Sequence, residues 1–300
     1  MSNHVTVLDG GMGRELLRIG APFRQPEWSA LALMEGPEWV VQAHANFIEA
    51  GAQVITTNSY AIVPFHIGDE RFAADARQLA ELSGRLARQA AAAAPGVTVA
   101  GSLPPLFGSY RPDLFDAAAA PQVIDPLVAG LRDHVDVWLG ETLGSVAEAV
   151  AVRAALDRAA DADHPLWLSF TLDDAVPGVL RSGEPVAEAV RAAVDLGATA
   201  VLFNCCQAEV ITAGIEIASA VAAGRAEVGG YANRFAPTHT SSGQANEQIS
   251  KFRDDLDPPS YCEFVGGWLD RGATMVGGCC GMNPDHIRAI ATLVAGRGAG

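Results

Sequence analysis

Short runs of apolar residues alternate with longer segments of helical pattern along the whole chain. Each apolar run is four to six residues long, which suits a buried strand better than a helix. The run at residues 227–231 is the weakest, because its glycines lower the β propensity. We expect strands at residues 5–8, 53–56, 97–100, 135–139, 165–170, 198–203, 227–231 and 273–276, and helices at residues 37–50, 70–94, 121–134, 145–160, 184–196, 209–223, 259–271 and 285–294.

This alternation predicts the fold. Strands that alternate with helices indicate a parallel sheet, and eight such units in 300 residues indicate an α/β protein with a single (β/α)8 TIM barrel. We interpret residues 1–300 as one domain. An open doubly wound sheet is the alternative, and the glycines after the first strand faintly suggest a dinucleotide site. However, Gly10-Gly11-Met12-Gly13 lacks the G-x-G-x-x-G spacing, because Gly20 comes too late.

Charge and composition exclude several classes of partner. The formal net charge is −15, and the twenty basic residues are scattered rather than clustered. Such a chain repels nucleic acid and anionic membranes, so we expect neither as a partner. No apolar stretch is long enough to span a bilayer. The first apolar run is interrupted by Asp9 and two glycines, so no signal peptide is predicted.

Cysteine usage indicates the compartment. All five cysteines lie in the last third of the chain, and their odd number argues against a secreted disulfide framework. A reducing, cytoplasmic location fits better. Cys206 follows Cys205 directly and would point the opposite way along a strand, so we expect it in the core. Cys262 lies on a predicted helix, and we expect it to be buried and inert.

Two adjacent cysteines near the C-terminus stand between a strand and a helix. Gly277 and Gly278 precede Cys279 and Cys280, and Asn283-Pro284 then marks a helix start with an N-cap and a first-turn proline. Adjacent cysteines can hardly form a disulfide with each other without strain. The pair alone fits two small buried hydrophobic residues as well as two metal ligands.

A third cysteine favours the metal. Cys205 also follows a strand-like run, at residues 198–203, so its thiol is expected at the same edge of the sheet. A catalytic zinc site uses three protein ligands and leaves one position open. Cys205, Cys279 and Cys280 supply those three ligands, and we predict a Zn²⁺ site.

These motifs resemble those of a known family. Phe203-Asn204-Cys205 is followed about seventy residues later by the paired cysteines between glycines, and Asp9-Gly10-Gly11 stands near the start. This combination resembles the homocysteine S-methyltransferase family. The resemblance extends over nearly the whole chain and includes residues 56–60, 101–104 and 141–142.

The resemblance implies the same barrel and a substrate site at the ends of its strands. Carboxylates would hold the ammonium of homocysteine, and glycine N–H groups would hold its carboxylate. Departures from the family pattern are Ala232, where members often carry proline, and the Gly101–Pro105 segment. Both border the expected donor site. The expected substrate-binding residues are Asp9, Gly10, Gly11, Thr56, Tyr60, Glu141 and Asn233.

The expected reaction is methyl transfer to homocysteine, giving methionine. Zinc deprotonates a coordinated thiol, so no further catalytic base is required. S-methylmethionine is the expected donor, ahead of S-adenosylmethionine, because no adenine-binding motif is visible. Betaine as donor and selenocysteine as acceptor remain open, as does a non-catalytic zinc-binding barrel. A thiol-redox enzyme would need a C-x-x-C pair or a reactive cysteine, and the chain has only adjacent cysteines. We expect a monomer or a small homo-oligomer.

Overall fold

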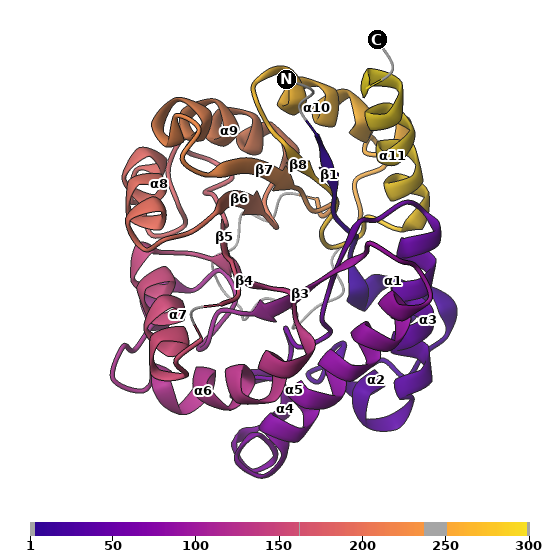
Figure 1. Ribbon diagram of the computed structural model, residues 1–300, viewed down its shortest axis with the longest axis vertical. Coiled ribbons are helices and arrows are strands. Elements are labelled where there is room, and N and C mark those ends of the chain that lie inside the picture. The colour runs from indigo at the N-terminus through magenta and orange to yellow at the C-terminus, as the bar shows by residue number, and fades with distance from the viewer. Residues whose placement is uncertain (1–3, 162, 237–250, 299–300) are drawn as a thin grey trace.

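Eight strands form a ring that is surrounded by helices (Figure 1). The computed structural model describes residues 4–161, 163–236 and 251–298. All strand pairs are parallel, and the helices cover the outside of the ring. The strands are β1 Thr6–Val7, β2 Val54–Thr56, β3 Thr98–Leu103, β4 Val137–Leu143, β5 Leu166–Phe170, β6 Ala200–Asn204, β7 Glu227–Tyr231 and β8 Met275–Val276.

The sheet closes on itself. Strands β2 to β8 pair in sequence order, and β1 pairs with β8 through Thr6 and Met275. The remaining edge closes through a parallel bridge between Leu8 and Val54, and the Gln53 N–H donates to the carbonyl of Val7 at 2.8 Å. The predicted (β/α)8 barrel is therefore confirmed, and the open doubly wound sheet is excluded.

Two strands run further than the apolar pattern indicates. Gly101 and Gly140 directly follow the strands predicted at residues 97–100 and 135–139, yet both lie inside strands, β3 and β4. A Cβ at Gly101 would lie 2.8 Å from the side chain of Val135, so this glycine permits close packing rather than a turn. The extension of β4 through Gly140 places Glu141 within a strand.

The helices follow the strands as predicted, with three additions. Helices α1, α2 and α4 were not predicted, because each is at most eight residues long, which is shorter than the segments that the helical pattern identifies. Asn283 caps α11 as expected, since its Oδ1 accepts from the N–H of Asp285 at 3.1 Å. The helices are α1 Met12–Ile19, α2 Ala30–Glu35, α3 Pro37–Glu49, α4 Pro64–Ile67, α5 Asp69–Ala92, α6 Ala120–Leu131, α7 Val146–Arg158, α8 Val186–Asp195, α9 Ala208–Ala222, α10 Pro258–Asp270 and α11 Pro284–Gly298.

The long loop expected after β7 is described only in part. Its two ends meet in an antiparallel bridge between Phe235 and Phe252, whose rings stack with centroids 6.0 Å apart. Residues 237–250 of that predicted loop lie outside the described residues. The described ends lie beside the loop after β8, because a Cβ at Gly281 would meet the ring of Phe252 at 2.7 Å.

The core has an inner and an outer layer, because successive strand residues face opposite sides. The small inner cluster fills the barrel and includes Leu139, Leu202 and Met275. The larger outer cluster lies between strands and helices and includes Trp138 and Phe203. Strands buried on both faces read as nearly continuous apolar runs, which is the pattern seen in the sequence.

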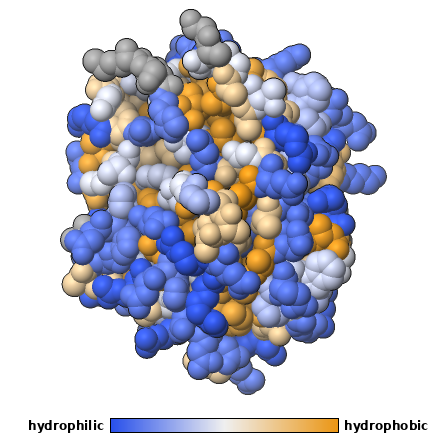
Figure 2. Space-filling view, turned by 45° about the vertical axis from the view of Figure 1, so that its right-hand side comes forward, coloured by the Kyte–Doolittle hydropathy of each residue, from blue (hydrophilic) through white to orange (hydrophobic). Residues whose placement is uncertain are grey.

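The surface is predominantly polar. Hydrophilic residues cover most of the face shown in Figure 2, and hydrophobic residues appear in separate areas between them. The large hydrophobic residues that are exposed belong to different segments: Leu17, Leu114, Val150 and Val176. Among the described residues, no helix is long and apolar enough to cross a membrane.

One buried histidine predicts how stability depends on pH. His44 of α3 is fully buried, and within the described part of the chain neither ring nitrogen has a hydrogen-bond partner. Burial lowers the pKa of His44 from 6.5 to about 3. The unfolded chain therefore binds a proton below pH 6.5 that the folded chain does not. This contribution to stability is complete above pH 6.5 and declines as the pH falls towards 3.

We expect His44 to lower the free energy of unfolding of the wild type by about 2.5 kcal/mol when the pH falls from 7 to 4.5. The free energy of unfolding of His44→Leu should fall by about 2.5 kcal/mol less than that of the wild type over the same pH range, because leucine does not titrate. Urea unfolding at both pH values, with a chelator present throughout, measures the difference. His4→Leu, at an exposed position, is the control and should follow the wild type. Equal acid sensitivity of His44→Leu and the wild type would contradict the assignment.

Candidate metal and substrate site

A cavity of about 90 Å³ opens at the carboxyl ends of the strands. This is the end at which barrel enzymes carry their active sites. Its walls come from the loops after β1, β2, β3, β6 and β8, from β4 and β7, and from the start of α1. The lining residues are Asp9, Gly10, Gly11, Met12, Gly13, Arg14, Trp28, Ser29, Thr56, Thr57, Asn58, Tyr60, Ser109, Tyr110, Glu141, Thr142, Cys205, Tyr231, Gly278, Cys279 and Cys280.

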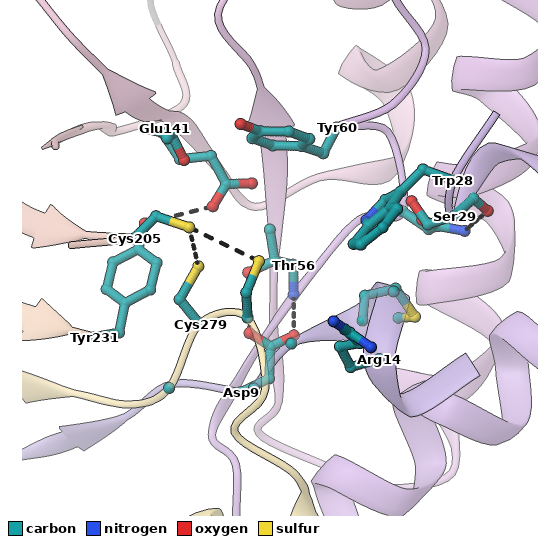
Figure 3. Close-up of a pocket in the computed structure, with 18 of the residues that line it drawn as sticks. Asp9, Arg14, Trp28, Ser29, Thr56, Tyr60, Glu141, Cys205, Tyr231 and Cys279 are labelled. Carbon is teal, nitrogen blue, oxygen red and sulfur yellow. Dashed lines mark hydrogen bonds between the residues drawn. The ribbon is translucent and has the colours of Figure 1, made fainter. Parts of the chain in front are cut away.

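The three predicted thiols converge in this cavity. The sulfur of Cys205 lies 3.1 Å from that of Cys279 and 3.7 Å from that of Cys280. All three sulfurs lie within 4.8 Å of one another. Figure 3 shows Cys205 and Cys279 facing each other, with Glu141 and Tyr231 beside them. The prediction that these cysteines meet across two strand ends is confirmed.

Glycines allow the loop after β8 to reach Cys205. The Gly278 N–H donates to the carbonyl of Asp9 at 2.9 Å, and the Cys279 N–H donates to Ala232 at 2.9 Å. A Cβ at Gly278 would lie 2.4 Å from the Met282 side chain. Gly281 has a φ of +87°, which glycine adopts without strain. The loop is thereby held between the loops after β1 and β7, with its thiols turned towards Cys205.

This arrangement of thiols fits a zinc ion. Two sulfurs on one tetrahedral zinc lie roughly 3.8 Å apart, given Zn–S bonds of about 2.3 Å. The separation of 3.7 Å between Cys205 and Cys280 agrees with that value, and the 3.1 Å between Cys205 and Cys279 is shorter. No other group of three potential ligands meets the same distance criterion among the described residues. Three sulfur donors are the number of protein ligands that a catalytic zinc site uses.

Two carboxylates share the cavity with the thiols. Asp9 accepts hydrogen bonds from the Thr56 N–H at 2.7 Å and the Thr56 hydroxyl at 3.1 Å. Glu141 accepts from the Ser102 hydroxyl and, at 3.5 Å, from the Tyr231 hydroxyl. Burial raises the pKa of Asp9 to about 8 and that of Glu141 to about 7. Burial is the main cause of both shifts, and a neighbouring acidic group adds to each, Glu141 for Asp9 and Cys205 for Glu141.

Of the other predicted substrate residues, some line the cavity and one does not. Thr56 and Tyr60 line the cavity, and the Tyr60 hydroxyl lies 2.8 Å from that of Ser109. Gly10 and Gly11 also line it, but the Gly11 N–H already donates to Met282 at 3.0 Å. That N–H is thus engaged by the protein instead of facing a substrate carboxylate.

Asn233 lies outside the cavity lining. It is 5% exposed, and its Oδ1 accepts from the N–H of Phe235 at 3.0 Å. The contact is local and shapes the turn that leaves β7. The structure therefore does not bring Asn233 together with the other predicted substrate residues.

The structure adds residues that the sequence did not indicate. Arg14 from α1 reaches the cavity, and its guanidinium lies 5.9 Å from the centre of the Trp28 ring (Figure 3). Tyr110, from the loop after β3, donates to the sulfur of Cys205 at 2.9 Å. Asn204 contacts Cys279 at 3.9 Å and links β6 to Thr142. Only Asn204 had a sequence signal, as the neighbour of Cys205.

Of the remaining cysteines, Cys206 lies in the core as expected, whereas Cys262 is less buried than expected. Cys206 is fully buried in the outer core, and burial raises its thiol pKa. Cys262 is partly buried on α10, where burial also raises the pKa of its thiol. Neither belongs to the thiol cluster.

The fold and the site together define a class of protein: a (β/α)8 barrel enzyme with a thiol cluster that could hold a metal at the carboxyl ends of its strands. The family description "Homocysteine S-methyltransferase" matches residues 6–294. The chain therefore belongs to the homocysteine S-methyltransferase family, as its motifs indicated, and homocysteine is the substrate that this assignment gives.

Individual relatives extend over nearly the same length. The chain is 27% identical to homocysteine S-methyltransferase 3 of Arabidopsis thaliana, over 96% of this chain and 89% of that protein. It is 26% identical to the selenocysteine Se-methyltransferase of Brassica oleracea, over 95% of this chain and 87% of that one. The metallated form of the homocysteine methyltransferase MmuM from Escherichia coli superposes with a TM-score of 0.78 at 28% identity, over 96% of both chains.

Proposed function

We propose that the protein transfers a methyl group from a sulfonium donor to homocysteine, with one Zn²⁺ held by Cys205, Cys279 and Cys280. The observation that carries this proposal is the convergence of three thiols in one cavity with two buried carboxylates. A zinc ion bound there supplies one chemical effect, the deprotonation of a coordinated thiol. The similar fold of a metallated homocysteine methyltransferase supports the same reading.

In the proposed reaction the thiol proton of homocysteine would leave to solvent when the sulfur binds as a thiolate, so the methyl transfer itself requires no further catalytic base. A bond forms between the homocysteine sulfur and the methyl carbon as the bond from that carbon to the sulfonium breaks. The electron pair of the broken bond stays on the donor sulfur, which becomes a neutral thioether. The protein's own residues therefore bind and orient both molecules and exclude water.

Charged groups in the cavity suit an amino acid. Asp9 and Glu141 are placed to accept from an ammonium group, whose positive charge would favour the ionised form of both buried carboxyls. Arg14 is the only cationic side chain among the described residues that line the cavity, and it suits a carboxylate. Thr56 orients Asp9, while Tyr60, Gly10 and Gly11 shape the wall. Asn233 would act only through the turn after β7.

The donor follows from the same charges. S-methylmethionine carries an ammonium and a carboxylate like homocysteine, so a cavity built for one amino acid suits the other. S-adenosylmethionine also needs room for its adenosine, and no adenine-binding motif is visible in the sequence. The assignment of residues 1–300 to one catalytic domain and the cytoplasmic location stay predictions.

We expect the specificity constant for S-methylmethionine to be at least about tenfold higher than that for S-adenosylmethionine. This ratio corresponds to roughly 1.4 kcal/mol of difference in transition-state binding. Betaine should give little turnover. Kinetics with zinc-loaded protein and homocysteine, measured side by side for the three donors, test this. A parallel series with selenocysteine compares the acceptors. A preference for S-adenosylmethionine or betaine would overturn the donor assignment. If the purified protein bound no zinc, or formed no methionine with any of the three donors, the proposed function itself would be overturned.

A further inference from the structure

The backbone at Cys205 adopts a conformation that is unfavourable for an L-residue. Its φ is +55°, in the left-handed region that costs an L-residue about 1–2 kcal/mol. Cys205 follows directly on β6, and its N–H donates to the carbonyl of Tyr231 at 3.3 Å. This turn aims the sulfur at Cys279 and Cys280, so the structure must stabilise it from outside.

One support acts on the sulfur. The hydroxyl of Tyr110 donates to the Sγ of Cys205 at 2.9 Å. Tyr110 comes from the loop after β3, on another part of the barrel rim. Its own φ is +63°, so the loop is also strained at the residue that delivers the hydroxyl. Strained residues of this kind persist where the surrounding contacts hold them.

A second support acts on the backbone just beyond Cys205. The Asp174 carboxylate accepts from the Gln207 N–H at 2.9 Å through one oxygen. Through its other oxygen it pairs with Arg181 at 2.6 Å, and both side chains are about three-quarters buried. The guanidinium of Arg181 lies over the Tyr110 ring, 5.2 Å from its centre. The Arg181–Asp174 pair thus contacts the Tyr110 ring, whose hydroxyl binds the Cys205 sulfur, and the backbone turn that follows Cys205.

We propose that Tyr110, with Arg181 and Asp174 behind it, is a positioning residue that orients the Cys205 thiolate towards the metal; this rests on the proposed function. The hydroxyl restricts the direction of the sulfur and withdraws charge from it. Groups that hydrogen-bond to metal ligands typically contribute 10–100-fold to metal affinity or activity. Tyr110 thereby adjusts how strongly Cys205 binds the ion, without contacting it.

The test is Tyr110→Phe in the full-length protein. Phenylalanine keeps the ring under Arg181 and removes only the hydroxyl. We expect zinc affinity, measured by competition with a chelator, to fall about 10–100-fold. In the Co²⁺-substituted protein, the sulfur-to-metal charge-transfer band should shift in energy, because the Cys205 sulfur loses a hydrogen bond. A purely structural role for Tyr110 would leave that band in place.

Ser83→Ala is the control. It removes a buried hydroxyl of α5 that donates to the carbonyl of Ala80 at 2.8 Å and does not line the cavity, so zinc affinity and the cobalt band should match the wild type. Asp174→Asn should reproduce part of the Tyr110→Phe effect, since it weakens the pair with Arg181 and keeps an acceptor for Gln207. Tyr110→Phe with wild-type affinity and an unshifted band would overturn the proposal. A wild type that binds no zinc would instead overturn the proposed function.

Discussion

Cys279→Ser is expected to lose essentially all bound zinc and all methionine formation. The serine hydroxyl is a far poorer ligand than a thiolate for zinc in a sulfur-rich site. Two sulfurs would remain, and the loss of a direct ligand should exceed the 10–100-fold typical of groups that only hydrogen-bond to one. Metal analysis after gel filtration should show about one zinc per wild-type chain and almost none for the variant. Cys205→Ser and Cys280→Ser should behave alike.

The chain provides two matched controls for these variants. Cys206 is adjacent to a ligand but lies in the outer core, and Cys262 lies on α10. Cys206→Ser and Cys262→Ser should retain the wild-type zinc content, although the buried hydroxyl in Cys206→Ser should lower stability by about 1–3 kcal/mol. Full zinc retention in Cys279→Ser, or zinc loss in Cys262→Ser with an intact fold, would show that the wrong thiols were chosen.

Much of the fold was predictable because strands of a parallel barrel are buried on both faces. Their continuous apolar runs stand out between helices, and the order of units then determines the order of strands. Residues that directly follow such runs, such as Asp9 and Cys205, must meet at one end of the barrel. This rule predicts from the sequence that the three thiols and both carboxylates lie close together.

The rest depended on loops and short helices, whose paths the apolar pattern does not reveal. Arg14 reaches the cavity because α1 starts directly after the glycines that follow β1, and that helix is too short to predict. Tyr110 reaches Cys205 only through a loop with a left-handed residue. The sequence suggested that the Gly11 N–H would be free to bind a substrate. In the structure this N–H donates to the carbonyl of Met282, in the loop after β8.

Glu141→Gln is expected to raise the Michaelis constant for homocysteine about 10–100-fold with little change in zinc content. A hydrogen bond to a charged group contributes roughly 1.5–3 kcal/mol, which corresponds to that range. Ser102 donates to Oε1 and Tyr231 to Oε2, so glutamine keeps an oxygen for one hydroxyl and presents its amide NH2 to the other. The substitution removes the negative charge that the ammonium requires. Steady-state kinetics at saturating donor, with metal analysis of the same samples, measure both quantities.

Glu148→Gln is the matched control for that change. Glu148 is also a buried glutamate whose pKa is raised to about 7 by burial, and it is 5% exposed. Its carboxylate accepts from the Gly144 N–H at 2.7 Å and does not line the cavity. The Michaelis constant of Glu148→Gln should therefore equal that of the wild type. Calorimetry that shows equal homocysteine affinity for Glu141→Gln and Glu148→Gln would remove Glu141 from the ammonium site and leave Asp9 as the carboxylate that binds it.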